Sequence, residues 1–202
     1  MRTRKTKAIL FDLGGVLCEL RGEAHMMKLL GGLCTREQMW RAWLASPAVR
    51  AHESGKLSEA EFARQVIAEF GLDIEPDAYL CAFRDWLVGP FPGALDLLDL
   101  TKARYQTALL SNIGSAHWPR VETMDVLPRV HHAFPSFKLG AVKPDAAYFR
   151  LALNAMGVSP EEAIFFDDNQ INCDGAQAFG IAAYCTRGVE ETQGKLVELG
   201  LL

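Results

Sequence analysis

Three short apolar runs, each followed at once by polar residues, constrain the fold of this chain more than any other feature. The runs cover residues 7–11, 105–110 and 163–166, and the residues that follow them are Asp12, Ser111-Asn112 and Asp167-Asp168. A continuous apolar run of this length is typical of a parallel strand that is buried on both faces. Ligands of open parallel sheets bind at the carboxyl ends of the strands. The pattern therefore predicts a parallel sheet that brings three polar segments to one edge.

Helical patterns separate these strands in the second half of the chain. Residues 145–156 carry apolar side chains at helical spacing, and Gly157 follows as a helix stop. From about residue 92 onward, helices alternate with strands, which predicts an α/β fold with a doubly wound, Rossmann-like parallel sheet.

The stretch from residue 20 to residue 89 has a different character. It shows no convincing strand but several helical segments, at 23–30, 35–44, 58–70 and 76–87. Ser58 and Glu61 have the spacing of a capping box at a helix start. We therefore predict a core formed by residues 1–19 and 90–202, with a small all-helical cap, residues 20–89, inserted after the first strand. A cap in that position is a natural lid.

Composition excludes several partners. The chain has 202 residues, half of them hydrophobic, which is enough for one core and a small additional module. A formal net charge of −4 gives no reason to expect nucleic acid or an anionic membrane as a partner. The basic residues 1–7 precede only four apolar residues, too few for a secretory core or a membrane span.

The cysteines also bear on the cellular location. The five cysteines form no CxxC pair, and their odd number fits reduced thiols. We expect a soluble, cytoplasmic protein. The pair His131-His132 is expected in a surface loop rather than at a metal, because neighbouring side chains diverge.

A fourth polar segment, Lys143-Pro144-Asp145, completes a set of groups suited to phosphoryl transfer. Asp12 ends a buried strand and would act as the nucleophile, which divides one difficult displacement into two easier ones. Asp167 and Asp168 are adjacent carboxylates, and buried like charges need a cation. Hard oxygen ligands of this kind suit Mg²⁺.

The order and spacing of the four segments resemble the four motifs of the haloacid dehalogenase (HAD) superfamily over nearly the whole chain. The helical insert matches that family's cap. Finer details resemble the branch that contains bacterial α-D-glucose-1-phosphate phosphatase and the phosphatase-like domain of soluble epoxide hydrolases. The segments that carry this likeness are residues 11–17, 53–58, Gly140 with 143–145, and 167–169 with Asn172, Gly175-Ala176 and Gly180.

The resemblance implies roles for individual residues. Asp12 would be nucleophile and Mg²⁺ ligand, and Lys143 would neutralise the charge of the nucleophile and the phosphate. Substrate phosphate would be held by four residues: Gly14, Gly15, Ser111 and Asn112.

For the metal, Asp168 would be the primary ligand, whereas Asp167 would coordinate directly or act from behind it. Asn169 and Asn172 would lie in the surrounding shell, where Asn172 orients a metal-bound water.

Gly14 departs from the pattern of most phosphatases in the superfamily. They carry at this position an aspartate whose side chain is the general acid and whose backbone carbonyl binds the metal. Glycine keeps the carbonyl but loses the acid, a group worth about 10²–10⁴-fold in rate.

The sequence thus predicts a Mg²⁺-dependent phosphatase that hydrolyses a small phosphorylated metabolite, a sugar phosphate for example, through an aspartyl-phosphate. One alternative is a 2-haloacid dehalogenase-type hydrolase, which attacks carbon without metal and also lacks the acid at the Gly14 position. The paired acids Asp167-Asp168 disfavour it. The other alternative is a catalytically weak protein that binds a phosphorylated ligand. The intact set of Asp12, Ser111, Lys143 and Asp168 argues against it.

Overall fold

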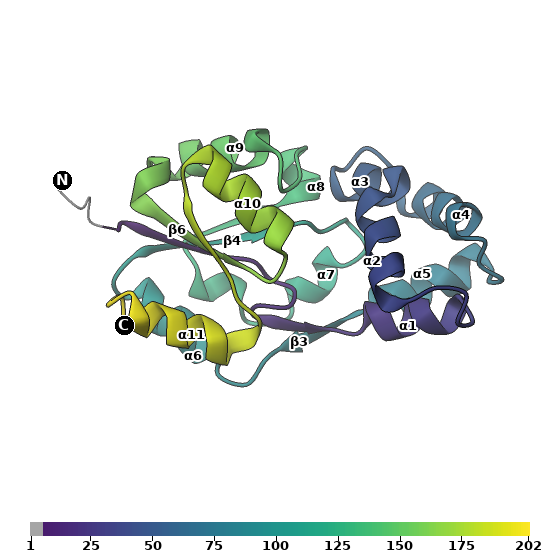
Figure 1. The fold of residues 1–202 in the computed structure, drawn as a ribbon, viewed down its shortest axis with the longest axis horizontal. Coiled ribbons are helices and arrows are strands. Elements are labelled where there is room, and N and C mark those ends of the chain that lie inside the picture. Colours follow the sequence, from purple (N-terminus) through teal and green to yellow (C-terminus); the bar gives the residue numbers. More distant parts are fainter. Residues whose placement is uncertain (1–5) are drawn as a thin grey trace.

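The computed structural model describes residues 6–202 and contains a five-stranded parallel sheet with helices on both faces (Figure 1). The first five residues of the basic segment discussed above, and of the expected core segment 1–19, lie outside the described residues. The order of the strands is β5-β4-β1-β6-β7, and every neighbouring pair is parallel. The strands are β1 (Ala8–Phe11), β4 (Gln106–Ser111), β5 (His132–Pro135), β6 (Ala163–Asp167) and β7 (Ala182–Cys185).

Alternation along the buried strands divides the core into two layers. Ile9 and Phe11 of β1 face one apolar cluster, whereas Ala8 and Leu10 face the other. The first cluster packs against α6 (Ala94–Lys102), α7 (Trp118–Val121) and α11 (Gly188–Glu198). The second packs against α9 (Ala146–Met156) and α10 (Gln170–Phe179). The predicted doubly wound α/β sheet is confirmed, with helices above and below it (Figure 1).

Short helical turns complete the connections of the sheet. They are η1 (Leu127–Arg129), α8 (Ser136–Leu139) and η2 (Pro160–Glu162). None of the helices among residues 6–202 is both long enough and apolar enough to cross a membrane.

Five helices form a separate group beyond the carboxyl ends of the strands (Figure 1). They are α1 (Gly22–Leu29), α2 (Arg36–Ala45), α3 (Pro47–Glu53), α4 (Glu59–Phe70) and α5 (Pro76–Arg84). They enclose an apolar cluster of their own, rich in aromatic rings, with Trp43, Phe62 and Phe83 among its members. Two antiparallel strands, β2 (Cys18–Leu20) and β3 (Leu87–Pro90), join the group to the sheet.

Several local expectations need correction. The stretch 20–89 does contain strand residues, because Leu20 ends β2 and β3 begins at Leu87. Helix α3 lies between two segments that we predicted as helices. Ser58 caps α4 as expected, but its hydroxyl also donates to the Glu61 carboxylate, so the reciprocal bond of a capping box is absent there.

One of the two adjacent histidines also lies elsewhere than expected. His132 is the first residue of the edge strand β5 rather than part of a loop. The Nδ1 atom of His131 accepts a hydrogen bond from the Thr107 amide, 3.1 Å away, and thereby attaches this segment to β4. The prediction failed because β5 is short and only partly buried, so no continuous apolar run marks it in the sequence.

Candidate active site

A buried ammonium group joins the carboxyl ends of three strands. Nζ of Lys143 lies 2.7 Å from Oδ1 of Asp12 and 2.6 Å from Oδ2 of Asp167, and it donates to the Leu110 carbonyl at 2.8 Å. Asp12 directly follows β1, and its amide donates to the Phe166 carbonyl of β6 at 2.8 Å. The structure therefore brings together groups that lie up to 155 residues apart in the sequence, from Asp12 to Asp167.

The charges in this cluster depend on one another. Burial alone would lower the pKa of Lys143, but the adjacent Asp12 and Asp167 carboxylates raise it above its usual value, so the lysine stays protonated. Burial raises the pKa of Asp12 to about 8, although the Lys143 ammonium opposes the shift. Removing one member of such a buried pair typically costs about 3–5 kcal/mol because the other charge is left uncompensated.

The two adjacent acids have different surroundings. The Asp167 carboxylate is fully buried, and besides Lys143 it accepts from the Asn169 amide at 2.9 Å and from the Asn172 side chain at 3.0 and 3.1 Å. Those donors occupy most of its lone pairs. The Asp168 side chain is only partly buried and accepts no such bonds from other side chains of residues 6–202.

Carboxylate oxygens of Asp12, Asp167 and Asp168 nevertheless lie within 4.8 Å of one another. Burial and the nearby Asp167 raise the pKa of Asp168 to about 6. Three hard oxygen donors at this spacing, with one free to turn toward a ligand, fit a small divalent cation such as Mg²⁺.

Gly15 lies directly against one of these acids. A Cβ atom at this position would lie 2.3 Å from Oδ2 of Asp168, and Gly15 has a φ of 78°. Only glycine combines that backbone conformation with so close an approach. The loop after β1 can therefore bring its backbone next to the acid pair, as its predicted contact with substrate phosphate requires.

The side chain of Asn112 positions the lysine. Its amide nitrogen donates to the Lys143 carbonyl at 2.9 Å, and its oxygen accepts from the Lys143 amide at 2.8 Å. We predicted that Asn112 would bind phosphate, and its side-chain bonds to Lys143 add a second role that the sequence did not indicate. Ser111 ends β4 and is 6% exposed, on the same strand end as the Leu110 carbonyl that Lys143 contacts.

Gly14 leaves no acid at its position. A Cβ there would lie 2.6 Å from Cδ1 of Leu20, so a β2 side chain occupies the space where a longer residue would begin. A carboxyl group of the helical group lies near this cluster. Glu53, at the end of α3, is close enough to Lys143 for that cation to lower its pKa against the effect of burial. No role for Glu53 could be predicted from the residues around it, and its place in the segment 53–58 is the only signal in the sequence.

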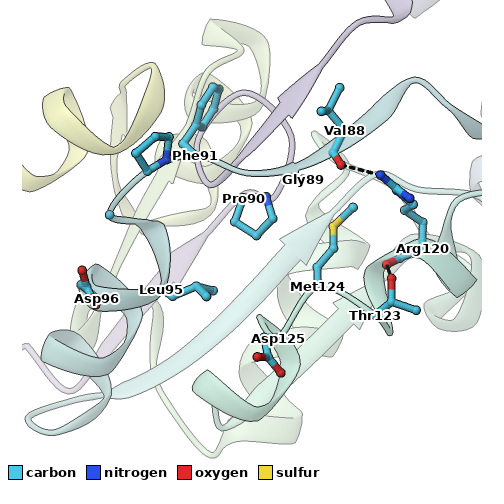
Figure 2. Close-up of a pocket in the computed structure, with 12 residues that line it drawn as sticks. Val88, Gly89, Pro90, Phe91, Leu95, Asp96, Arg120, Thr123, Met124 and Asp125 are labelled. Carbon is cyan, nitrogen blue, oxygen red and sulfur yellow. Dashed lines mark hydrogen bonds between the residues drawn. The ribbon is translucent and has the colours of Figure 1, made fainter.

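An open hollow of about 700 Å³ lies elsewhere, between β3, α6 and α7 (Figure 2). None of the site residues named above lines it. Arg120 of α7 borders it and donates to the Val88 carbonyl at 2.8 Å, which attaches α7 to β3.

Comparisons with known proteins agree with this geometry. A family model described as haloacid dehalogenase-like hydrolase matches residues 6–180. A HAD family enzyme from Bacteroides thetaiotaomicron superposes with a TM-score of 0.73 at 27% identity, over 91% of this chain and 95% of that one. The wild-type form of that enzyme, in complex with magnesium and inorganic phosphate, gives a TM-score of 0.72 at 26% identity over 90% and 94% of the two chains.

Two curated proteins also resemble the chain. A phosphatase of Mycobacterium tuberculosis is 25% identical over 201 residues, which cover 94% of this chain and 91% of that protein. Drimenol cyclase of Aspergillus calidoustus is 33% identical over 66 residues, and the chain spans only 12% of its length.

Proposed function

Because the chain belongs to the haloacid dehalogenase-like hydrolase family, we propose that it is a Mg²⁺-dependent phosphatase of small phosphorylated metabolites. The observation that carries the proposal is the buried cluster in which Lys143 joins Asp12 to the acid pair. The phosphatase of Mycobacterium tuberculosis and the phosphate complex of the Bacteroides enzyme support the same reaction class.

The reaction follows from the positions of the side chains. A carboxylate oxygen of Asp12 attacks phosphorus, the bond to the leaving oxygen breaks, and that oxygen takes up a proton. Water then attacks the aspartyl-phosphate, the bond between phosphorus and Asp12 breaks, and inorganic phosphate leaves. Lys143 orients Asp12 and offsets the charge that accumulates when phosphate enters.

The metal would be held by Asp12, by Asp168 and by the carbonyl of Gly14. When bound, Mg²⁺ neutralises negative charge on the phosphate oxygens. Asp167 would support the site without binding the metal directly, because its carboxylate already accepts hydrogen bonds from Lys143, Asn169 and Asn172.

We assign the five-helix group, within the expected boundaries 20–89, the role of a cap over this site. Its position beyond the carboxyl ends of the strands supports that assignment (Figure 1). A sugar phosphate is the proposed substrate class, on the resemblance to the glucose-1-phosphate phosphatase branch. The acid pair disfavours the alternative of a dehalogenase, which needs no metal.

The decisive experiment removes the nucleophile. With p-nitrophenyl phosphate and Mg²⁺, Asp12→Asn should lower kcat by on the order of 10³-fold or more. EDTA should abolish the wild-type activity, and added Mg²⁺ should restore it. Asp174→Asn makes the same chemical change on the exposed side of α10 and serves as the control.

Two results would contradict the proposal. One is full turnover in EDTA. The other is metal-independent release of chloride from 2-chloropropionate that disappears in Asp12→Asn, which would identify a dehalogenase.

A further inference from the structure

The proposed reaction leaves one task without a residue. An alkoxide leaving oxygen needs a proton as its bond to phosphorus breaks, and Gly14 has no side chain to supply it. A proton donor must therefore come from another element.

The end of α3 is pressed against the core at the rim of the site. A Cβ atom at Gly55 would lie 2.3 Å from the Phe137 carbonyl, so the backbone of the cap contacts that of α8 directly. His52 lies against Gly114, where a Cβ would be 2.1 Å from its Nε2. Gly114 follows the Ser111-Asn112 segment at the end of β4, and α3 lies beside α8 in Figure 1.

Helix α3 makes a third contact with the core. Arg50 forms an ion pair with Asp145, two residues after Lys143. Residues three apart lie on the same face of a helix, so Arg50 and Glu53 share the face that points to the Lys143 loop. Contacts at positions 50, 52 and 55 therefore surround Glu53 on the core side.

The Glu53 side chain has no partner in this position. It is partly buried, yet its carboxylate forms no hydrogen bond or ion pair with any of residues 6–202. The charged groups that face it are both cations, Lys143 from the core and Arg50 from its own helix. A carboxyl group left free at the rim of a reaction site is available to a substrate.

We propose that Glu53 is the general acid of this enzyme, the cap residue that protonates the leaving oxygen in place of an acid at position 14. The inference rests on the proposed phosphatase function. As the phosphorus–oxygen bond breaks, its electron pair stays on the leaving oxygen, and the Glu53 O–H transfers its proton there. The Glu53 carboxylate then takes a proton from the water that attacks the aspartyl-phosphate, which returns the acid to its starting state.

The protonation state of Glu53 suits this task. Burial raises its pKa to about 7, although Lys143 and Arg50 oppose the shift. A general acid is most effective when its pKa lies near the working pH.

The test compares two substrates of similar shape in Glu53→Gln. Phenyl phosphate has a poor leaving group, whereas p-nitrophenolate leaves readily without a proton. We expect Glu53→Gln to lower kcat/KM for phenyl phosphate by on the order of 10²-fold but that for p-nitrophenyl phosphate by only a few-fold. In the wild type, kcat/KM for phenyl phosphate should fall as the pH rises above about 7, and this limb should disappear in the variant.

Glu37→Gln is the matched control, because Glu37 is an exposed cap glutamate whose partner is Arg41 on the same helix. It should leave both substrates and the pH profile unchanged. The p-nitrophenyl phosphate rate shows that each variant is folded.

An unchanged ratio of the two substrates in active Glu53→Gln would overturn the inference, and so would equal losses for both. Either result leaves the proposed function intact, since that depends on Asp12→Asn and EDTA.

Discussion

At the scale of single residues, two adjacent glycines after β1 have opposite consequences. Gly14 removes a functional group, whereas Gly15 makes room for one, because its missing side chain allows Asp168 to approach the loop. The backbone at Gly15 is also left-handed, with φ 78°.

Gly15→Ala should therefore disable the site more than it destabilises the fold. The added methyl group would displace Asp168, so we expect phosphatase activity to fall by on the order of 10²-fold or more, with weakened Mg²⁺ binding. Gly157→Ala is the control, because Gly157 has a similar φ of 66° but no atom within 4 Å of the new Cβ. That variant should lose only about 1–2 kcal/mol of stability and keep its activity. Equal activity losses, measured with p-nitrophenyl phosphate and by Mg²⁺ titration, would contradict this account.

The sequence indicated which residues form the site better than it indicated the role of each residue. Asp12, Lys143 and Asp167 each follow or adjoin a recognisable motif, so their convergence could be predicted from strand ends. Their bonds could not, since the saturation of Asp167 by Asn169 and Asn172 depends on three-dimensional contacts. The free carboxyl of Glu53 depends on how the cap packs, which no local pattern reports.

At the scale of elements, α3 is the helix that connects the cap to the core. Its first turn is held by Ser46, which is 1% exposed, accepts from the Val49 amide at 3.1 Å and donates to Glu69 of α4 at 2.7 Å. The middle of the helix carries the Arg50 ion pair, in which both side chains are about half exposed. The Ser46 cap and the Arg50 ion pair should therefore contribute different amounts to the free energy of unfolding.

Ser46→Ala should lower the free energy of unfolding by about 1–2 kcal/mol, because a buried helix cap is lost. Arg50→Gln should change it by no more than about 0.5 kcal/mol, because solvent screens an exposed pair. Urea denaturation of both variants measures the difference. A larger loss for Arg50→Gln would show that the interface, rather than the cap of the helix, stabilises α3.

Elements were predicted from sequence where the apolar pattern is long, as in the helices, or continuous, as in the buried strands. Helices α4 and α9 and strands β1, β4 and β6 fall close to their predicted positions. The elements missed or misplaced are short: α3 has seven residues, β2 three and β5 four. Strand β1 also has four residues, but all of them are buried and form a continuous apolar run, whereas β5 is only partly buried and has no such run.

At the scale of the whole molecule, the clustered carboxylates link stability to pH and to metal. Burial raises the pKa values of Asp12 and Asp168 to about 8 and about 6. Between pH 4 and 8 the folded state therefore binds more protons than the unfolded chain, and this contribution to stability is lost as the pH rises. A bound cation favours the ionised carboxylates and should reverse the loss.

We expect Mg²⁺ at 100 times its Kd to stabilise the fold by about 2.7 kcal/mol, or roughly 5–10 °C in Tm for a chain of this size. At one fixed Mg²⁺ concentration, the increase over the Tm in EDTA should be larger at pH 8 than at pH 6, because the carboxylates are ionised more fully at pH 8 and bind the cation more tightly. Thermal unfolding at both pH values, with and without Mg²⁺, gives the measurement. Asp168→Asn should lose most of the increase and Asp174→Asn should keep it, so equal increases in the two variants would contradict the assignment of the site.

The antiparallel pair β2-β3 has a consequence for how such chains diversify. Leu20 and Leu87 are register partners in this pair, so the chain enters the helical group and leaves it at neighbouring points. A segment inserted between Leu20 and Leu87 therefore needs only to bring its two ends close together. The entropic cost of doing so rises only slightly with the length of the segment. The helical segment is thus an exchangeable cassette, which can be lengthened, shortened or replaced by recombination while the strands that hold Asp12 and its partners keep their register. If Glu53 supplies the proton, exchanging that cassette changes the chemistry together with the choice of substrate.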